Sequence, residues 1–478
     1  MLFNSIDFAI FLPLVFIIYW VIGSNNYKSQ NALLVVSSYV FYGWWDWRFL
    51  ILILFSTVLD FFIGKKLLIE QDAKKRKLLL WTSIGVNLGL LGFFKYFNFF
   101  LDNFKTAFTF FGSELNLGML NIILPVGISF YTFQTLSYSI DIYNKKLKPT
   151  KDFIAFSAFV CFFPQLVAGP IERATNLLPQ FLNKRSFNYT NAKDGLRQIL
   201  WGLFKKIVIA DNSAKFVNII FDNYEDYSGS TLVLGAILFA FQIYGDFSGY
   251  SDIAIGTSRL FGFNLKQNFA FPYFSRDIAE FWRRWHISLS TWFRDYLYIP
   301  LGGSQGSKYR VIRNVFIIFI VSGFWHGANW TFIVWGFLNA LYFIPLLVLK
   351  RNRNNLEVVA SNSNIPSIKE VAQMLITFAL TCIAWIFFRA ENIMEAFDYL
   401  LRIPSKTLLK LPEIQPYYLF IFIVLFLLIE WKGRNNKFAL EKFWLEKPAL
   451  LRWFLYYTII ICMYIYGISN QEFIYFQF

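Results

Sequence analysis

Residues 315–349 read VFIIFIVSGFWHGANWTFIVWGFLNALYFIPLLVL, two apolar runs joined at Trp325-His326-Gly327. Runs of this kind are typical of helices that cross a bilayer, which need roughly 20 apolar residues. Three basic residues follow directly (Lys350, Arg351 and Arg353), and basic residues mark the cytoplasmic side of a membrane protein. Residues 311–349 are therefore predicted to form a broken membrane hairpin whose two ends face the cytoplasm and whose apex carries His326.

Similar apolar runs recur along all 478 residues, of which 56% are hydrophobic and 21% aromatic, and the mean hydropathy is +0.46. Soluble domains have lower values, so the sequence predicts an all-α polytopic membrane protein, organised as one domain over residues 1–478. We expect about ten or eleven crossings from apolar runs of this length. The first run, 6–23, lacks a basic flank and a cleavage site and is expected to be a retained span. The other expected spans are 78–98, 118–143, 197–220, 230–257, 370–388, 415–431 and 450–467.

The net charge of +15 does not indicate nucleic-acid binding, because the basic residues lie in short loops between apolar runs. The segment 258–310 is long, basic and aromatic, and is predicted to be cytoplasmic or re-entrant. Pro164 predicts a broken element within 152–170. Residues 352–366, rich in Asn and Ser, are predicted to be a flexible cytoplasmic loop, and 222–226 an acidic outer loop. The three cysteines are scattered in apolar segments and predict neither a disulfide framework nor a metal site.

His326 is one of only two histidines in the chain. It is predicted to lie at membrane depth between Gly323 and Gly327, which permit close backbone approach and leave room for a substrate. An ionisable group there is costly unless it faces a cavity or stays neutral. Neutral imidazole is also the form that a general base needs, so His326 is the leading catalytic candidate, with Trp325 and Asn329 as neighbouring substrate contacts. The alternative is a histidine that only bonds two helices together.

The second histidine, His286, lies in the segment 281–296, FWRRWHISLSTWFRDY. At about 3.6 residues per turn, this segment forms one helix with His286 at the boundary of an aromatic and a polar stripe. It is either an interfacial amphipathic helix or a helix that lines a cytoplasmic entrance. In the second case Arg283, Arg284 and Arg294 are available to an anionic donor such as a nucleotide phosphate. The candidate substrate contacts here are Trp282, Arg283 and Asp295.

Asp246, Ser248 and Asp252 form a polar cluster in the apolar run 230–257. Each aspartate costs about 3 kcal/mol in hydrocarbon unless it is paired or hydrated. The cluster therefore predicts a polar pocket or a salt bridge to the arginine-rich segment that follows. An anchoring ion pair and a substrate contact both stay open.

Taken in order, these motifs resemble the membrane-bound O-acyltransferase (MBOAT) family, most closely its bacterial branch of alginate, peptidoglycan and teichoic-acid acylation proteins. The resemblance covers nearly the whole chain: Met1–Asp60, Leu124–Tyr131, Gln165–Ile171, Asp246–Asp252, Trp282–Gly303, Trp325–Gly327 and Trp385–Ala390. It implies a ring of tilted transmembrane helices with re-entrant segments around a trans-bilayer tunnel. It also implies that His326 is the catalytic histidine and that His286 takes the family's second, upstream position.

The resemblance further implies a bacterial cytoplasmic (inner) membrane enzyme that contacts the lipid bilayer, an acyl donor and a glycan acceptor. An acetyl group moves from a cytoplasmic thioester donor, acetyl-CoA, towards hydroxyls of an extracytoplasmic cell-wall or secreted polysaccharide, with His326 as general base and no bound cofactor. An exported serine-hydrolase-like (SGNH-type) protein is the expected partner. The alternatives are D-alanyl transfer to a teichoic-type polymer and a non-catalytic lipid or glycan transporter, although no inverted repeat is evident. A metal-dependent hydrolase is disfavoured because two histidines are few for such a site.

Overall fold

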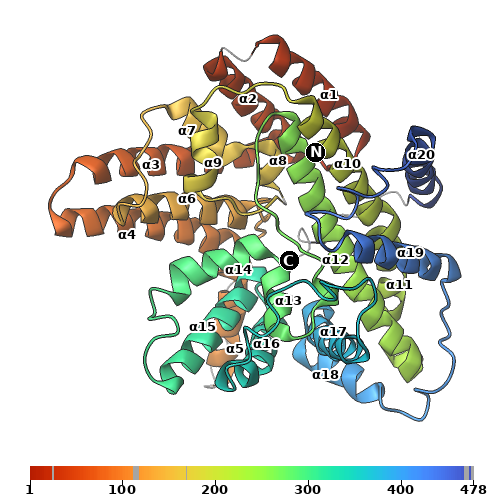
Figure 1. Ribbon diagram of the computed structural model, residues 1–478. Helices are drawn as coiled ribbons and strands as arrows, with labels where there is room; N and C mark the ends of the chain where they lie inside the picture. The colour runs from red at the N-terminus through yellow and green to blue at the C-terminus, as the bar shows by residue number, and fades with distance from the viewer. Residues whose placement is uncertain (24–25, 111–117, 168, 468–472, 475–478) are drawn as a thin grey trace. The chain divides into compact units, whose positions relative to one another are not determined.

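The computed structural model describes residues 1–23, 26–110, 118–167, 169–467 and 473–474, and Figure 1 traces its helices. No strand occurs within these ranges, so the predicted all-α class is confirmed. The chain forms two compact units: Met1–Ala192 with Thr257–Leu265, and Lys193–Gly256 with Lys266–Phe478. Both histidines lie in the second unit, which therefore positions the candidate site.

The first unit is a set of packed helices in which α3 and α4 both contact α6, and α2 contacts α7. The break predicted within 152–170 is confirmed: α7 ends at Cys161, and α8 begins at Phe163 with Pro164 in its first turn. Ala168 of the Gln165–Ile171 motif lies outside the described residues. The elements are α1 (Ile6–Val21), α2 (Tyr27–Asp46), η1 (Trp47–Phe49), α3 (Leu50–Ile69), α4 (Ala73–Leu91), η2 (Gly92–Tyr96), α5 (Phe97–Phe110), α6 (Ile128–Tyr143), α7 (Phe153–Cys161), α8 (Phe163–Leu166) and α9 (Ala174–Phe181).

The expected span 118–143 is wrong in its first half, because α6 begins only at Ile128. Gly127, just before it, has a φ of +74°, a left-handed conformation that favours glycine. A Cβ atom at this position would lie 2.6 Å from the carbonyl oxygen of Leu166, so the turn also needs a residue without a side chain. Pro125 stands two residues earlier and cannot donate a backbone hydrogen bond.

The second unit contains most of α12, the longest described helix, whose residues from Thr257 onward belong to the first unit, and the helix pair α15 and α16. The elements from the unit boundary onward are α10 (Tyr189–Phe204), η3 (Lys205–Ala210), α11 (Asp211–Asp222), η4 (Tyr224–Asp226), α12 (Gly229–Leu260), η5 (Pro272–Phe274), α13 (Ile278–Arg284), α14 (Ile287–Phe293), η6 (Arg294–Tyr298), α15 (Lys308–His326), α16 (Trp330–Val348), α17 (Ile368–Arg389), α18 (Ile393–Arg402), α19 (Tyr417–Gly433) and α20 (Ala449–Tyr466).

The predicted broken hairpin is present as α15 and α16, which lie side by side (Figure 1). Two glycines allow their backbones to touch: a Cβ on Gly323 would lie 2.2 Å from the Phe332 carbonyl oxygen, and one on Gly336 would lie 2.3 Å from that of Phe319. The break falls between His326 and Trp330, where the Asn329 side chain caps α16 by accepting from the Thr331 N–H at 3.1 Å. His326 is therefore the last residue of α15.

Six helical segments among the described residues are long and apolar enough to cross a membrane, which is fewer than the ten or eleven apolar runs in the sequence. The other runs fold into helices that are shorter or more charged, such as α1 and α7–α8, or continue from one helix into the next, as α2 does into α3. The six segments are Tyr27–Ile69, Ala73–Phe110, Gly229–Leu260, Trp330–Val348, Ile368–Arg389 and Ala449–Tyr466. The chain is therefore a multi-pass membrane protein.

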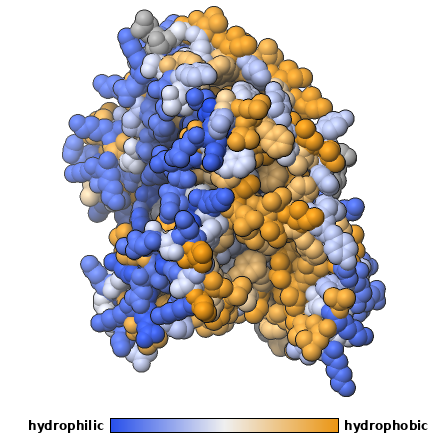
Figure 2. Space-filling model, turned by 45° about the vertical axis from the view of Figure 1, so that its right-hand side comes forward, coloured by the Kyte–Doolittle hydropathy of each residue, from blue (hydrophilic) through white to orange (hydrophobic). Residues whose placement is uncertain are grey.

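The surface supports this assignment, because large hydrophobic side chains are exposed on many helices. Leu450 and Tyr464 of α20, for example, are 80% and 89% exposed. Figure 2 shows broad hydrophobic areas of surface next to hydrophilic ones. Apolar surface of this extent is not stable in water and requires lipid or another protein against it.

Candidate active site

His326 lies in a pocket of aromatic side chains and is only 3% exposed. The centroid of its ring lies 5.0 Å from that of Trp325, 5.1 Å from that of Trp335 in α16 and 5.4 Å from that of Phe388 in α17. Three helices therefore hold the imidazole, and the walls around it are largely apolar.

The structure corrects the local fold around His286. The predicted continuous helix over 281–296 is wrong: α13 ends at Arg284, α14 begins at Ile287, and His286 between them has a φ of +43°. Backbone hydrogen bonds to a distant segment replace the helical ones, because the Ile287 N–H donates to the Asn268 carbonyl at 2.9 Å. The Ala270 N–H donates in turn to the Arg284 carbonyl at 2.9 Å.

The interfacial interpretation of this segment is also wrong. Trp285 and His286 are 1% and 0% exposed, and Leu289 is 2% exposed, so the aromatic stripe faces protein and not lipid headgroups. Burial lowers the pKa of His286 from its usual 6.5 to about 3, which keeps this imidazole neutral at physiological pH.

Trp325 connects the two histidines. Its ring centroid lies 6.1 Å from that of His286 and 5.0 Å from that of His326. Phe247 of α12 packs against the other side of the group, with its ring centroid 4.6 Å from that of His286. Residues about forty positions apart in the sequence are thus brought into one buried aromatic cluster.

A pocket of about 500 Å³ lies next to this cluster. Neither histidine lines the pocket, but Ile287, which follows His286, does, as does Ser322, one helical turn before His326. The lining includes the predicted residues Trp282, Arg283 and Arg294, and also Arg353, which sequence reasoning used only to orient the membrane hairpin. The remaining lining side chains are mostly apolar, so the pocket combines a cationic rim with an apolar wall.

Three predicted residues of the segment have other roles. Arg284 is not available to a ligand, because its guanidinium pairs with Glu280 at 2.9 Å and donates to the Ala270 carbonyl at 3.1 Å. Asp295 pairs with Arg294 at 2.7 Å and does not line the pocket. The Trp282 indole N–H donates to the Asn339 side chain at 3.2 Å, which fixes this ring at the pocket wall.

The aspartate cluster is paired with lysines and not with the arginine-rich segment, so that predicted salt bridge is wrong. Lys206 binds both Asp246 and Asp211 at 2.8 Å, and Lys205 binds Asp252 at 2.6 Å. Both lysines belong to the π-helical turn η3, whose wider geometry breaks the run between α10 and α11. The available signal was the pair Lys205-Lys206 inside an otherwise apolar run. Ser248 is 1% exposed and its hydroxyl has no hydrogen-bond partner within the described residues.

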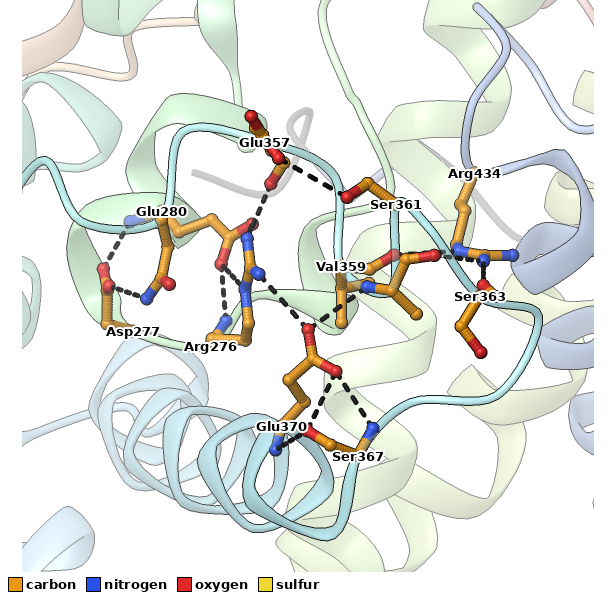
Figure 3. Close-up of polar contacts among 12 residues, drawn as sticks. Arg276, Asp277, Glu280, Glu357, Val359, Ser361, Ser363, Ser367, Glu370 and Arg434 are labelled. Carbon is orange, nitrogen blue, oxygen red and sulfur yellow. Dashed lines mark hydrogen bonds and ion pairs between the residues drawn. The ribbon is translucent and has the colours of Figure 1, made fainter.

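The loop 350–367 is held firmly, which corrects the expectation of a flexible segment. Figure 3 shows Arg276 bonded to Glu280 and Glu370 while Arg434 reaches the loop from α19. Arg434 donates to the carbonyls of Val359, Ala360 and Ser363 at 2.7–3.0 Å. Arg283 donates to two further loop carbonyls, those of Asn352 and Asn355, at 2.8 and 2.7 Å. Loop residues Asn352, Arg353 and Leu356 complete the pocket wall.

Replacing Arg434 with alanine is expected to loosen this loop. Hydrogen bonds from a charged donor contribute about 1.5–3 kcal/mol each, so even partial loss should raise the local opening constant at least about tenfold. Hydrogen–deuterium exchange of the peptide that contains 357–365 measures the change. Arg434→Lys keeps the charge but not the planar set of donors and should show an intermediate rate. Unchanged exchange in Arg434→Ala would contradict the assigned contacts.

A second pocket of about 490 Å³ lies beyond the His326 turn. Asn329 links the His326 turn to this second pocket, because its side-chain amide donates to the carbonyl of Glu391, a lining residue, at 2.7 Å. Phe388, which packs on His326, directly precedes Arg389, another lining residue. The lining is Phe221, Asp222, Tyr224, Arg389, Glu391, Asn392, Met394, Glu395 and Asp398, so four of its five charged side chains are acidic.

The fold and the site define a class: multi-pass helical membrane proteins with a pair of buried histidines in one aromatic cluster. The chain matches MBOAT, the membrane-bound O-acyltransferase family, over residues 144–388, a range that contains both histidines. It is 40% identical over 399 residues to the probable alginate O-acetylase AlgI of Pseudomonas aeruginosa. The matched region covers 83% of this chain and 73% of the relative. The protein belongs to the membrane-bound O-acyltransferase family and is an acyltransferase.

Two further relatives mark the range of similarity. The chain is 37% identical over 429 residues to the peptidoglycan O-acetyltransferase of Helicobacter pylori, covering 84% of this chain and 79% of the relative. It is 26% identical over 284 residues to the teichoic acid D-alanyltransferase of Bacillus subtilis, covering 57% of this chain and 70% of the relative. The resemblance stated from the motifs is thereby confirmed.

Proposed function

We propose that this enzyme transfers an acetyl group from acetyl-CoA towards hydroxyls of an extracytoplasmic polysaccharide in the bacterial inner membrane. The observation that carries the proposal is that both histidines of the chain lie in one buried aromatic cluster, and that Ile287 and Ser322, close to them in the sequence, line a pocket with three arginines. The two O-acetylating relatives support the acetyl group, since each is similar over more of this chain than the D-alanyl relative. D-alanyl transfer to a teichoic-type polymer is the alternative.

The pocket of about 500 Å³ is the proposed donor site. Its volume and mixed lining suit a thioester whose one end is phosphorylated and whose other end is apolar. Arg283, Arg294 and Arg353 supply positive charge at the rim, and guanidinium groups bind phosphate through paired, charge-assisted hydrogen bonds. Loop 350–367 follows the basic end of α16, which the charge pattern assigns to the cytoplasm, where acyl-CoA donors are made.

In the proposed reaction, His326 takes the proton from an incoming hydroxyl. The hydroxyl oxygen attacks the thioester carbonyl carbon, the carbon–sulfur bond breaks, and the CoA thiolate leaves with the proton that His326 returns. A neutral, buried imidazole is suited to this role because it can accept and later release one proton. The hydroxyl belongs to the glycan or to a serine of an exported SGNH-type partner.

The pocket of about 490 Å³ is the proposed acceptor side. It contains Asp222, at the edge of the loop whose acidic charge assigns it to the outer face. Carboxylates accept hydrogen bonds from sugar hydroxyls, and an asparagine side chain can both accept and donate them. Asp246, Asp252 and Asn329 are proposed to hold the helices and the His326 turn, and Ser248 stays a candidate for substrate contact because its hydroxyl is buried and unbonded in the described structure.

Replacing Arg283 with alanine tests the donor site. One lost charge-assisted contact is worth about 1.5–3 kcal/mol, so the KM for acetyl-CoA should rise about tenfold or more while kcat changes little. The assay is transfer of labelled acetyl from acetyl-CoA by purified protein in lipid vesicles. Arg434→Ala, which loosens the same loop from outside the pocket, is the matched control and should leave KM nearer to wild type. Absence of any acetyl-CoA turnover by the wild-type protein would reject the proposed reaction in favour of D-alanyl transfer.

A further inference from the structure

We propose that Asn268 is a positioning residue that fixes His286 in the tautomer with hydrogen on Nδ1, so that Nε2 is a hydrogen-bond acceptor within the active site. Asn268 is 0% exposed and comes from the segment between α12 and η5, eighteen positions before His286. The tautomer follows from contacts alone, whereas its kinetic consequence rests on the proposed function.

The orientation of the Asn268 amide is determined by three contacts. Its side-chain oxygen accepts from the Ser288 backbone N–H at 3.2 Å and from the Ser288 hydroxyl at 2.9 Å. Its side-chain nitrogen donates to the Ser251 hydroxyl at 3.1 Å. A flipped amide would place its NH₂ group against the Ser288 N–H, which also only donates. The oxygen therefore faces Ser288 and His286.

That orientation decides which imidazole nitrogen carries the hydrogen. His286 Nδ1 lies 3.1 Å from the Asn268 side-chain oxygen. An amide oxygen can only accept, so Nδ1 must donate. A neutral imidazole carries one N–H, which leaves a lone pair on Nε2. This nitrogen is buried and has no hydrogen-bond partner among the residues that the structure describes.

The backbone of Asn268 also holds His286 in place. Its carbonyl accepts the Ile287 N–H at 2.9 Å, so one residue bonds both the side chain of His286 and the main chain beside it. His286 keeps its left-handed backbone conformation because these contacts determine it from two sides. The Phe247 ring, at 4.6 Å from the imidazole centroid, further limits rotation.

The tautomer of His286 determines which substrate groups its Nε2 can bind. A nitrogen with a lone pair binds an O–H or N–H group of a substrate, such as the acceptor hydroxyl or an amide of the donor. It cannot donate to the oxyanion that forms from the thioester carbonyl. His286 therefore accepts a hydrogen bond from a substrate group, His326 remains the proposed base, and the oxyanion needs another donor.

The tautomer can be observed directly because the chain has only two histidines. Protein labelled with [15N]histidine, in lipid, gives imidazole nitrogen resonances from two residues, and His326→Ala leaves those of His286 alone. We expect His286 to show a protonated Nδ1 and an unprotonated Nε2 at neutral pH, and Asn268→Ala to give a mixture of tautomers. In protein that keeps Asn268, a protonated Nε2 or an imidazolium at His286 would overturn the proposal, whatever the enzyme's activity.

Kinetics supply the second test. Asn268→Ala should lower kcat by the same factor as His286→Ala, and the double variant should be no slower than either, because both remove one function. Asn268→Asp keeps an accepting oxygen beside His286 but adds a negative charge that favours the imidazolium. The kcat of this variant should therefore fall as the pH is lowered, over a range where the kcat of the wild type stays constant. Additive losses, or an unchanged pH profile in Asn268→Asp, would overturn the positioning role. Absence of transfer by the wild-type protein, with the expected tautomer present, would count against the proposed reaction alone.

Discussion

Replacing His326 with alanine is expected to lower acyl transfer by about 10²–10⁴-fold while the protein still inserts and folds, because positioned base catalysis contributes that factor. The imidazole touches three rings but lies at the end of α15, so its removal leaves the helix contacts in place. Transfer of labelled acetyl from acetyl-CoA at saturating donor measures the effect.

Two further substitutions separate chemistry from packing. His326→Gln keeps a polar side chain of similar length, and His326→Phe keeps a ring in the aromatic pocket; neither can act as a base. Both should be as inactive as His326→Ala. If His326→Phe were nearly as active as wild type, the residue would be a packing histidine, the alternative left open by the sequence.

Replacing Lys206 with methionine is expected to lower the free energy of unfolding by roughly 3–5 kcal/mol, because it leaves buried carboxylates without their cation. Lys206 is 1% exposed and binds Asp211 and Asp246, which are each 2% exposed. The same ion pairs join η3 and α11 to α12, so their loss should loosen the packing around the long helix. Thermal unfolding in one fixed detergent measures the effect.

Lys215→Met is the matched control, since Lys215 is exposed on α11 and should tolerate the change. Adding Asp211→Asn and Asp246→Asn to Lys206→Met should restore part of the stability, because no unpaired charge then stays buried. Normal stability of Lys206→Met together with lost acyl transfer would instead make Asp246 a substrate contact.

The hairpin and His326 were predictable because their signals are local. Two apolar runs, small residues at 323 and 327, and a single ionisable group between them describe α15, the break and α16 correctly. The helix start at Asn329 is likewise a local signal, since an asparagine cap precedes the second run.

The surroundings of His286 were not predictable from its own segment. The periodicity of 281–296 favours one helix, but hydrogen bonds to the Asn268 carbonyl and from the Ala270 N–H break it at His286. Asn268 carries no local sign of its role, because the contact forms only when two separate segments meet. The same holds for Lys206 and Asp246, which are forty positions apart in sequence and share one ion pair only in the folded unit.

Loop 350–367 is held by hydrogen bonds to its main-chain carbonyl oxygens. Arg276, Arg283 and Arg434 all donate to backbone carbonyl oxygens there, and the carbonyl of Asn364 accepts from the Trp431 indole at 2.9 Å. Every residue offers the same carbonyl, so this recognition imposes little on the amino-acid identities of the loop. Positions of the loop that do not line the pocket can therefore change while its path is retained, and an exposed position such as Ser361 is suited to carry a spectroscopic label.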